Sequence, residues 1–190
     1  MKIFSGKGLV GSCFMQSWEL EFAKEELSQR GEPQEILPGL FLGSLACTQD
    51  NFLEKLNSLH ITHILSVGGT SGRSGDPNYE GKRLELVGVD DLPNYNLFQH
   101  FDQCCAFIDN AFKDEGKVLV HCFHGKSRSA AIVAAYLIYK EKCTPDQAIH
   151  KIQEQRPVAN PNHGFRKQLN NFYIKASLSV AKDTCLLRIK

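Results

Sequence analysis

Short apolar runs alternate along the chain with longer segments whose apolar residues recur at helical spacing. The runs that are typical of buried strands are residues 61–67, 83–89 and 117–120. Ile36 and residues 40–42 form a further apolar stretch, which Pro38 and Gly39 interrupt. Because proline is confined mostly to the edges of sheets, this stretch predicts a segment of an edge strand.

Five segments have the apolar spacing of helices. Thr48 and Asn96 are placed to cap the first two of them. The third, residues 129–139, is apolar on nearly every side, which predicts a helix buried in the middle of the domain. The apolar faces of the first, second and fifth helices are Phe52, Leu53, Leu56 and Leu59, then Phe101, Cys105, Ile108 and Phe112, and finally Phe165, Leu169, Phe172 and Ala176.

The fourth helix has the clearest start. Thr144 and Gln147 are spaced as a capping box, and Pro145 stands between them at the first helical position. The helix should end near Arg156, because Pro157 follows directly and cannot continue it.

The alternation of strands and helices predicts an α/β fold, with a central, mainly parallel sheet flanked by helices. A chain of 190 residues, 42% of them hydrophobic, is expected to form one domain. We place this domain at residues 34–177, an N-terminal extension with a short helix at residues 1–33, and a C-terminal tail at residues 178–190.

The charge balance indicates which binding partners to expect, and the cysteine spacing indicates the cellular compartment. The 22 Lys and Arg residues nearly balance the 21 Asp and Glu residues, so we expect no broad basic surface for nucleic acid or an anionic membrane. No apolar run is long enough to span a bilayer, and Lys2 excludes the N-myristoylation pattern. The seven cysteines lack the spacing of zinc ligands, which favours a reducing compartment, the cytoplasm or the nucleus, and no metal site.

One segment, between the run at residues 117–120 and the buried helix, carries a pattern suited to phosphate chemistry. It consists of His121, Cys122, Phe123, His124, Gly125, Lys126, Ser127, Arg128 and Ser129. A loop that enters a helix N-terminus points successive backbone N–H groups inward, and the helix dipole adds positive potential there. We therefore predict that residues 123–128 bind the phosphate of a substrate.

Four residues of this segment have individual roles. The planar guanidinium of Arg128 is suited to bind two phosphate oxygens at once. Cys122 begins the loop, where N–H groups and the helix dipole lower the pKa of a thiol, and it is the predicted nucleophile. Gly125 permits the turn. His121 is expected to orient the thiolate through the neighbouring backbone rather than to accept its proton.

A single cysteine at the end of a strand is more often a small buried side chain than a nucleophile. Here a glycine, an arginine and two hydroxyl groups follow Cys122 at the spacing of a phosphate-binding loop, so their joint occurrence favours the chemistry. His124 and Lys126 either contact charged groups of a substrate or point into solvent, and the sequence favours neither interpretation. Cys104 and Cys105 lie on an apolar helical face and are predicted to be core residues.

This segment resembles the H-C-x5-R motif of the cysteine-based phosphatases, in the form typical of dual-specificity phosphatases. Other segments that look like this family are residues 39–43, 61–65 and 135–138, Arg156 with Pro157, residues 161–165, and Gln168 with Leu169. Together they make residues 34–175 similar to a small, atypical member of the family.

The resemblance implies that residues 34–177 are a catalytic domain that hydrolyses phosphotyrosine and phosphoserine or phosphothreonine in proteins through a phosphocysteine intermediate. It implies that Ser129 donates a hydrogen bond to the cysteine sulfur and eases its departure. Phosphorylated proteins are then the expected partners, with protein kinases, and a mitogen-activated protein kinase in particular, as candidate substrates. Nucleic acid and membranes are not expected partners, and no metal or other cofactor is required.

The resemblance also implies a general acid, an aspartate on a mobile loop ahead of the motif. Asp91 stands five residues before Asn96, which Leu97 follows, as in the acid loop of this family. Asp90 fits this spacing less well. We therefore assign Asp91 as the general acid and Asp90 as a solvated carboxylate.

Two alternatives stay open at this point. The substrate can be a phosphate other than a phosphoprotein, but phosphoinositide phosphatases carry a lysine where Phe123 stands, and RNA 5′-triphosphatase relatives share His124 but carry Asn where Ser127 stands. Alternatively, the chain is a pseudophosphatase that binds phosphate without turnover. The presence of every group that the chemistry requires argues against this second alternative.

Overall fold

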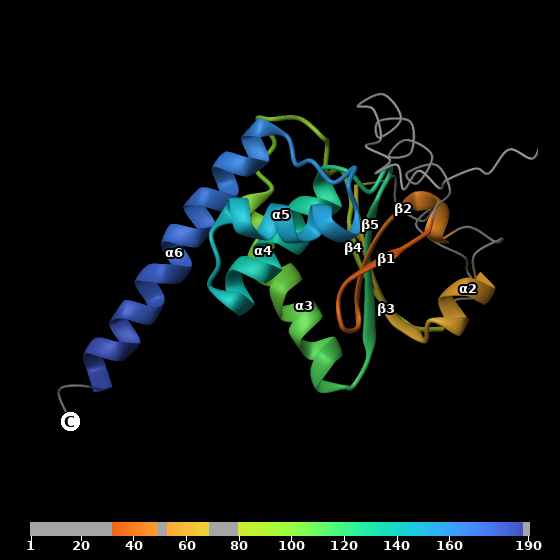
Figure 1. The fold of residues 1–190 in the computed structure, drawn as a ribbon, viewed down its shortest axis with the longest axis horizontal. Helices are drawn as coiled ribbons and strands as arrows, with labels where there is room; N and C mark the ends of the chain where they lie inside the picture. Colours follow the sequence, from red (N-terminus) through yellow and green to blue (C-terminus); the bar gives the residue numbers. More distant parts are fainter. Residues whose placement is uncertain (1–31, 49–52, 69–79, 188–190) are drawn as a thin grey trace, which may run out of the picture.

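The computed structural model describes residues 32–48, 53–68 and 80–187, and in this part of the chain five strands form one sheet (Figure 1). The strands are β1 (Gln34–Leu37), β2 (Leu40–Ser44), β3 (Ile61–Val67), β4 (Lys82–Leu86) and β5 (Lys117–Cys122). They are ordered β1-β2-β5-β3-β4, and every neighbouring pair except β1 with β2 is parallel. The predicted α/β fold with a mainly parallel sheet is confirmed.

The stretch predicted as one edge strand segment is a hairpin of two strands, β1 and β2. Pro38 and Gly39 form the turn between them, and Gly39 has a φ of 83°, which suits glycine. Only β1 lies at the edge of the sheet, whereas β2 pairs with the central strand β5. The prediction was therefore wrong for residues 40–42, because the chain reverses at the turn instead of continuing along one edge.

Four α-helices lie on one side of the sheet and a shorter helix lies on the other (Figure 1). The first group is α3 (Phe101–Lys113), α4 (Arg128–Glu141), α5 (Pro145–Gln155) and α6 (His163–Leu187). Ten consecutive residues of α4, from Ser129 to Ile138, are buried, which confirms the helix predicted for the middle of the domain. On the other face, α2 (Leu53–Ser58) covers a small apolar cluster that contains Phe41, Cys47, Leu56, Ile61, Ile64 and Leu119.

The capping box of α5 is confirmed, because the side chains of Thr144 and Gln147 each accept a hydrogen bond from the backbone N–H of the other. The cap predicted at Asn96 is wrong, and the residues that Thr48 would cap, 49–52, lie outside the described residues. Thr48 ends the 3-10 helix η1 (Leu45–Thr48), where its hydroxyl donates to the Leu45 carbonyl. Asn96 precedes a second 3-10 helix, η3 (Phe98–His100), so that α3 begins only after His100.

Two strands end at positions other than those predicted. β4 covers Lys82–Leu86 and stops before Gly88, whose positive φ of 70° turns the chain out of the strand. β5 continues past residue 120 through Cys122, since its last residues still pair with β2 and β3 on either side. The extra length of β5 places the cysteine on the last position of the central strand.

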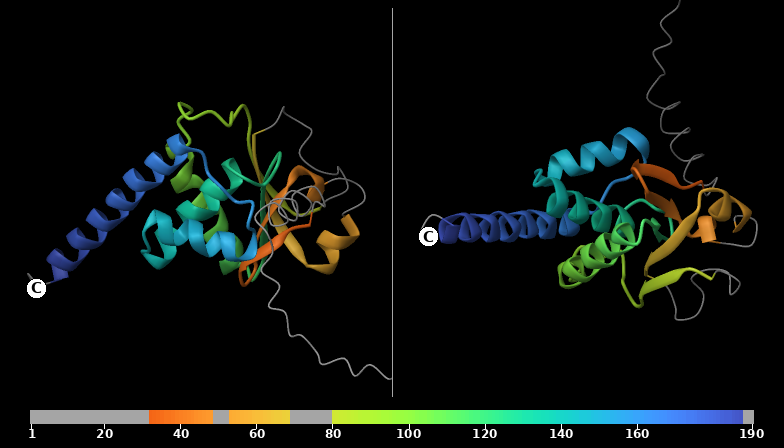
Figure 2. Two further views of the ribbon diagram at one scale, coloured as in Figure 1. Left: turned by 45° about the horizontal axis from the view of Figure 1, so that its top comes forward. Right: turned by 90° about the horizontal axis from the view of Figure 1, so that it is seen from below.

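The last helix, α6, is longer than the predicted apolar face up to Ala176, and it projects away from the rest of the domain (Figures 1 and 2). It continues past residue 177, after which we expected the tail. The domain limits stay a prediction.

Two expectations cannot be compared with the structure. The helix predicted in the N-terminal extension and the predicted core position Phe52 lie outside the described residues. Among the residues described, none of the helices combines the length and the apolarity needed to cross a bilayer.

We predict that Thr144→Ala lowers the free energy of unfolding by about 1 kcal/mol, because it removes the side-chain acceptor at the start of α5. Thr144→Ser retains the hydroxyl group and should stay close to the wild type. Urea denaturation of the three proteins measures the difference. Equal midpoints for Thr144→Ala and the wild type would show that the capping box does not stabilise this helix.

Candidate active site

The loop between β5 and α4 turns sharply at Gly125. This residue has a φ of 66°, and a Cβ atom on it would lie 2.4 Å from the Gly43 carbonyl oxygen and 2.6 Å from Arg156 Nη2. Only glycine fits this position, for both conformational and steric reasons. Strand β2 supports the start of the loop, since Ser44 is in register with Cys122 and Leu45 N–H donates to the Phe123 carbonyl at 3.1 Å.

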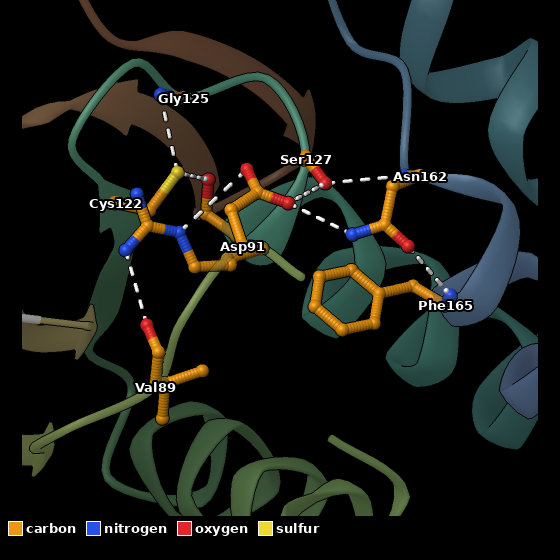
Figure 3. Close-up of polar contacts among 9 residues, drawn as sticks. Val89, Asp91, Cys122, Gly125, Ser127, Asn162 and Phe165 are labelled. Atoms are coloured by element: carbon orange, nitrogen blue, oxygen red, sulfur yellow. Dashed lines mark hydrogen bonds and ion pairs between the residues drawn. The ribbon is translucent and has the colours of Figure 1, made fainter. Parts of the chain in front are cut away.

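Two donors converge on the sulfur of Cys122 (Figure 3). Gly125 N–H lies 3.2 Å from Sγ, and the hydroxyl of Ser129 in the first turn of α4 lies 3.1 Å from it. The cysteine is 2% exposed. Donors of this kind can stabilise negative charge on sulfur, both in a free thiolate and in a departing one.

The guanidinium of Arg128, the first residue of α4, lies beside the Asp91 carboxyl group. We call the region where these two groups face Cys122 the opening of the site (Figure 3). Arg128 Nη1 donates to the Val89 carbonyl at 3.1 Å, and a Cβ atom on Gly68 would lie 2.3 Å from that nitrogen. Gly68 therefore leaves the space that the guanidinium occupies. Arg128 Nε is buried and makes no hydrogen bond with the described residues, and its nearest charged atom is Asp91 Oδ2 at 3.7 Å. A buried donor without an acceptor suits an oxyanion ligand.

The carboxyl group of Asp91 reaches this loop, as predicted (Figure 3). Its Oδ1 accepts hydrogen bonds from Ser127 Oγ at 2.6 Å and from Asn162 Nδ2 at 2.9 Å. Its side chain is 37% exposed, so a substrate has access to it. Asp90 is exposed and makes no hydrogen bond with the loop in the part of the chain that the structure describes. The structure therefore brings Asp91, and not Asp90, next to Arg128.

His121 is buried in the sheet, and its Nε2 lies 2.7 Å from Ser66 Oγ on the neighbouring strand β3. Because successive side chains of a strand point to opposite faces, His121 points away from the Cys122 side. Burial lowers its pKa to about 4, so the imidazole is neutral at neutral pH and too weak a base to hold the proton of a thiol. The orienting role expected of His121 stays a prediction.

The side chains of the loop differ in their exposure to solvent. Phe123 is 59% exposed, and its ring lies edge-on to that of His124 with 4.7 Å between the ring centroids. His124 and Lys126 are exposed, whereas Ser127 is buried and holds Asp91. The loop thus presents the ring of Phe123 and the side chains of His124 and Lys126 to solvent and keeps Ser127 inside.

Sequence reasoning missed Arg156, which is 2% exposed and lies beneath the loop. Its Nε donates to the Gly125 carbonyl at 2.8 Å, its Nη2 donates to the His124 carbonyl at 3.1 Å, and its Nη1 pairs with Gln34 Oε1. Burial lowers the pKa of this guanidinium, but an arginine stays charged in proteins. Because the C=O and N–H of a trans peptide point in opposite directions, Arg156 turns the N–H groups of Gly125 and Lys126 away from itself, and the Gly125 N–H reaches Cys122 Sγ.

Sequence reasoning also missed Asn162. The only sequence signal for Arg156 and Asn162 was their place in segments that resemble the family, and that signal assigned them no role. Their partners lie 31 and 71 residues away along the chain, so no local pattern connects them with the loop or with Asp91.

Comparison with known proteins gives a consistent result. The family model "Dual specificity phosphatase, catalytic domain" matches residues 40–175. Dual specificity protein phosphatase 1 of Arabidopsis thaliana is 42% identical over 139 residues, which are 73% of this chain and 68% of that protein. The MAP kinase phosphatase with leucine-rich repeats protein 3 of Dictyostelium discoideum is 39% identical over 146 residues, which are 75% of this chain but 16% of that protein.

A solved structure is similar as well. The crystal structure of the human tyrosine phosphatase-like serine/threonine/tyrosine-interacting protein superposes with a TM-score of 0.68. It is 38% identical in sequence, and the match covers 75% of this chain and 96% of that chain. This structure carries the same fold as the chain described here.

We predict that Arg156→Lys destabilises the protein and lowers kcat/KM toward a phosphate ester. A lysine ammonium cannot reach all the acceptors that the fork of Arg156 binds, and each buried carbonyl left unpaired costs about 1–3 kcal/mol. Chemical denaturation and steady-state kinetics measure the two effects. Lys151→Arg, a surface change at the Glu141 ion pair, is the matched control and should alter neither. Wild-type stability in Arg156→Lys would show that the carbonyl groups need no support.

We predict that His121 makes folding stability depend on pH between about 4 and 6.5. In this window the unfolded chain binds a proton at His121 and the folded chain does not, so stability falls as the pH is lowered and is fully present above pH 6.5. The loss is of the order of 3 kcal/mol. Denaturation of the wild type and His121→Gln at a series of pH values measures it. Parallel stability curves would refute the assignment.

Proposed function

The chain belongs to the dual specificity phosphatase family, and we propose that it hydrolyses phosphotyrosine and phosphoserine or phosphothreonine in proteins through a phosphocysteine intermediate. Membership confirms the resemblance found in the sequence. The observation that carries the proposed mechanism is the convergence of donors on the Cys122 sulfur, with Arg128 and Asp91 at the same opening.

In the first step, the thiolate of Cys122 attacks phosphorus in line with the ester oxygen. The S–P bond forms as the P–O bond breaks, while Arg128 and the N–H groups of the loop bind the three other phosphate oxygens. Asp91, as a neutral carboxylic acid, gives its proton to the leaving oxygen. The products are the dephosphorylated side chain and a phosphocysteine.

In the second step, water attacks the phosphocysteine. The carboxylate of Asp91 takes a proton from this water as the new P–O bond forms, and the S–P bond breaks. The hydroxyl of Ser129, 3.1 Å from Sγ, stabilises the departing thiolate. Inorganic phosphate leaves, and the cysteine and the protonated aspartate are ready for another cycle.

The ion pair between Arg128 Nε and Asp91 Oδ2 fits this sequence of events. A phosphate dianion in the loop competes for Arg128, so the carboxylate loses its counter-charge when the substrate binds. The nearby negative phosphate then favours the neutral form of Asp91. Substrate binding itself thus favours the form of the acid that the first step needs.

We propose phosphorylated proteins, and among them a MAP kinase, as substrates. The name of the Dictyostelium discoideum relative, a MAP kinase phosphatase, supports this choice. The exposed Phe123, His124 and Lys126 around the opening are placed to contact the polypeptide that flanks a phosphorylated residue. A reducing compartment, the cytoplasm or the nucleus, suits an enzyme that works through a thiolate.

The experiment that tests this function is turnover of para-nitrophenyl phosphate and of phosphopeptides by the wild type, Cys122→Ser, Asp91→Asn and Asp90→Asn. We expect Cys122→Ser to be inactive on both substrates. Asp91→Asn should lose about 10²- to 10⁴-fold in kcat on phosphoserine peptides, whose leaving oxygen needs a proton, and less on the aryl phosphate. Asp90→Asn should behave as the wild type.

The pH–rate profiles of the same proteins check the assignment of the acid. The basic limb reports the protonated carboxylic acid and should vanish in Asp91→Asn. Loss of this limb in Asp90→Asn instead would move the acid by one residue. A wild type that binds phosphate or vanadate without turnover would identify the chain as a pseudophosphatase.

A further inference from the structure

We propose that Asn162 is a positioning residue for the general acid, and that with Ser127 it confines the catalytic proton to one oxygen of Asp91, Oδ2. This inference rests on the proposed function, because it presupposes that Asp91 protonates the leaving group.

The two oxygens of the Asp91 carboxyl group have different surroundings (Figure 3). Oδ1 accepts hydrogen bonds from Ser127 Oγ and Asn162 Nδ2, at 2.6 and 2.9 Å. A proton on Oδ1 would point at two donors, so in the neutral acid the proton must sit on Oδ2. Oδ2 is also the oxygen next to Arg128 Nε, at 3.7 Å, and it therefore faces the group that binds the phosphate.

The direction of each of these hydrogen bonds follows from its neighbours. Ser127 Oγ accepts from the backbone N–H of Asn162 at 3.1 Å, so its own proton is available for Asp91. The side-chain oxygen of Asn162 accepts from Phe165 N–H in the first turn of α6 at 3.0 Å. Since the amide oxygen is used there, the NH₂ group must be the part that faces Asp91.

Helix α6 holds the rest of the acid loop as well. Gly164 packs so closely against the loop that a Cβ atom on it would lie 1.9 Å from the Pro93 carbonyl oxygen. Gln168 accepts from Phe98 N–H at 2.7 Å and donates to the Tyr95 carbonyl at 2.8 Å. The start of α6 thus fixes this loop from Asp91 to Phe98, and we infer that the position of the acid is set before a substrate binds.

The variant that isolates this role is Asn162→Asp. Aspartate caps a helix as well as asparagine does, so the contact with Phe165 N–H is retained. The donor that faces Asp91 is replaced by an acceptor, which removes one of the two bonds that hold Oδ1. Asn170→Ala, an exposed change on the same helix, is the matched control, because in the described part of the chain the Asn170 side chain hydrogen-bonds to the Arg166 carbonyl of its own helix and not to the acid loop.

We expect Asn162→Asp to lower kcat on a phosphoserine peptide about 10- to 10²-fold, the usual cost of a misplaced catalytic group, with KM nearly unchanged. The loss on an aryl phosphate with a weakly basic leaving group should be much smaller, because that oxygen needs little protonation. Gly164→Ala, which pushes the loop away but leaves every hydrogen-bonding side chain in the sequence, should show the same selective loss. Asn170→Ala should match the wild type on both substrates.

Asp91→Asn in the same assays separates the two proposals. If it shows the selective loss and Asn162→Asp does not, the positioning role is wrong and the general acid stands. If Asp91→Asn itself shows no selective loss, the proposed acid is wrong. An equal loss on both substrates in Asn162→Asp and Gly164→Ala, together with a lower denaturation midpoint, would mean that this contact is structural only and would overturn the inference.

Discussion

The connection between α5 and α6 holds the loop on which the chemistry depends. Arg156 binds the carbonyl groups of residues 124 and 125, Asn160 N–H donates to the Lys126 carbonyl at 2.7 Å, and Asn162 N–H donates to the Ser127 hydroxyl. Four consecutive loop residues, 124–127, therefore accept hydrogen bonds from this connection. Because each peptide N–H points away from its own carbonyl group, this support turns the Gly125 N–H toward Cys122, where we propose that the phosphate binds.

Charge is distributed unevenly around the cysteine. Two guanidinium groups lie near it, Arg156 buried under the loop and Arg128 at the opening, and only the second is placed to contact a substrate. His121, directly before Cys122, adds no charge at neutral pH, because burial lowers its pKa to about 4. In the proposed mechanism, the negative charge of the nucleophile and of the phosphate is thus balanced by arginines, which stay protonated in proteins, and by backbone dipoles.

The fold class and the nucleophilic loop could be predicted from the sequence, since strands, buried helix and loop residues each follow from local patterns. Cys122, Arg128 and Ser129 lie within eight residues, and β5 leads directly into α4. Asp91 was found only through family resemblance. The helix cap predicted at Asn96 was wrong because the 3-10 helix η3 precedes α3, and such turns leave no mark in apolar spacing. Arg156 and Asn162 act over long sequence separations, which local patterns cannot reveal.

The connection between α5 and α6 supports the proposed phosphate-binding loop at one end and the proposed general acid at the other. At its start, Arg156 holds the proposed phosphate-binding loop, and at its end Asn162 holds the carboxyl group of the proposed general acid, Asp91. Ser127 joins the two, because it belongs to the phosphate loop and donates to Asp91. Residues 156–162 therefore contact both the loop of the proposed nucleophile, Cys122, and the proposed acid, Asp91. When a site is assembled before the substrate binds, the binding energy can stabilise the transition state and is not needed to order the catalytic groups.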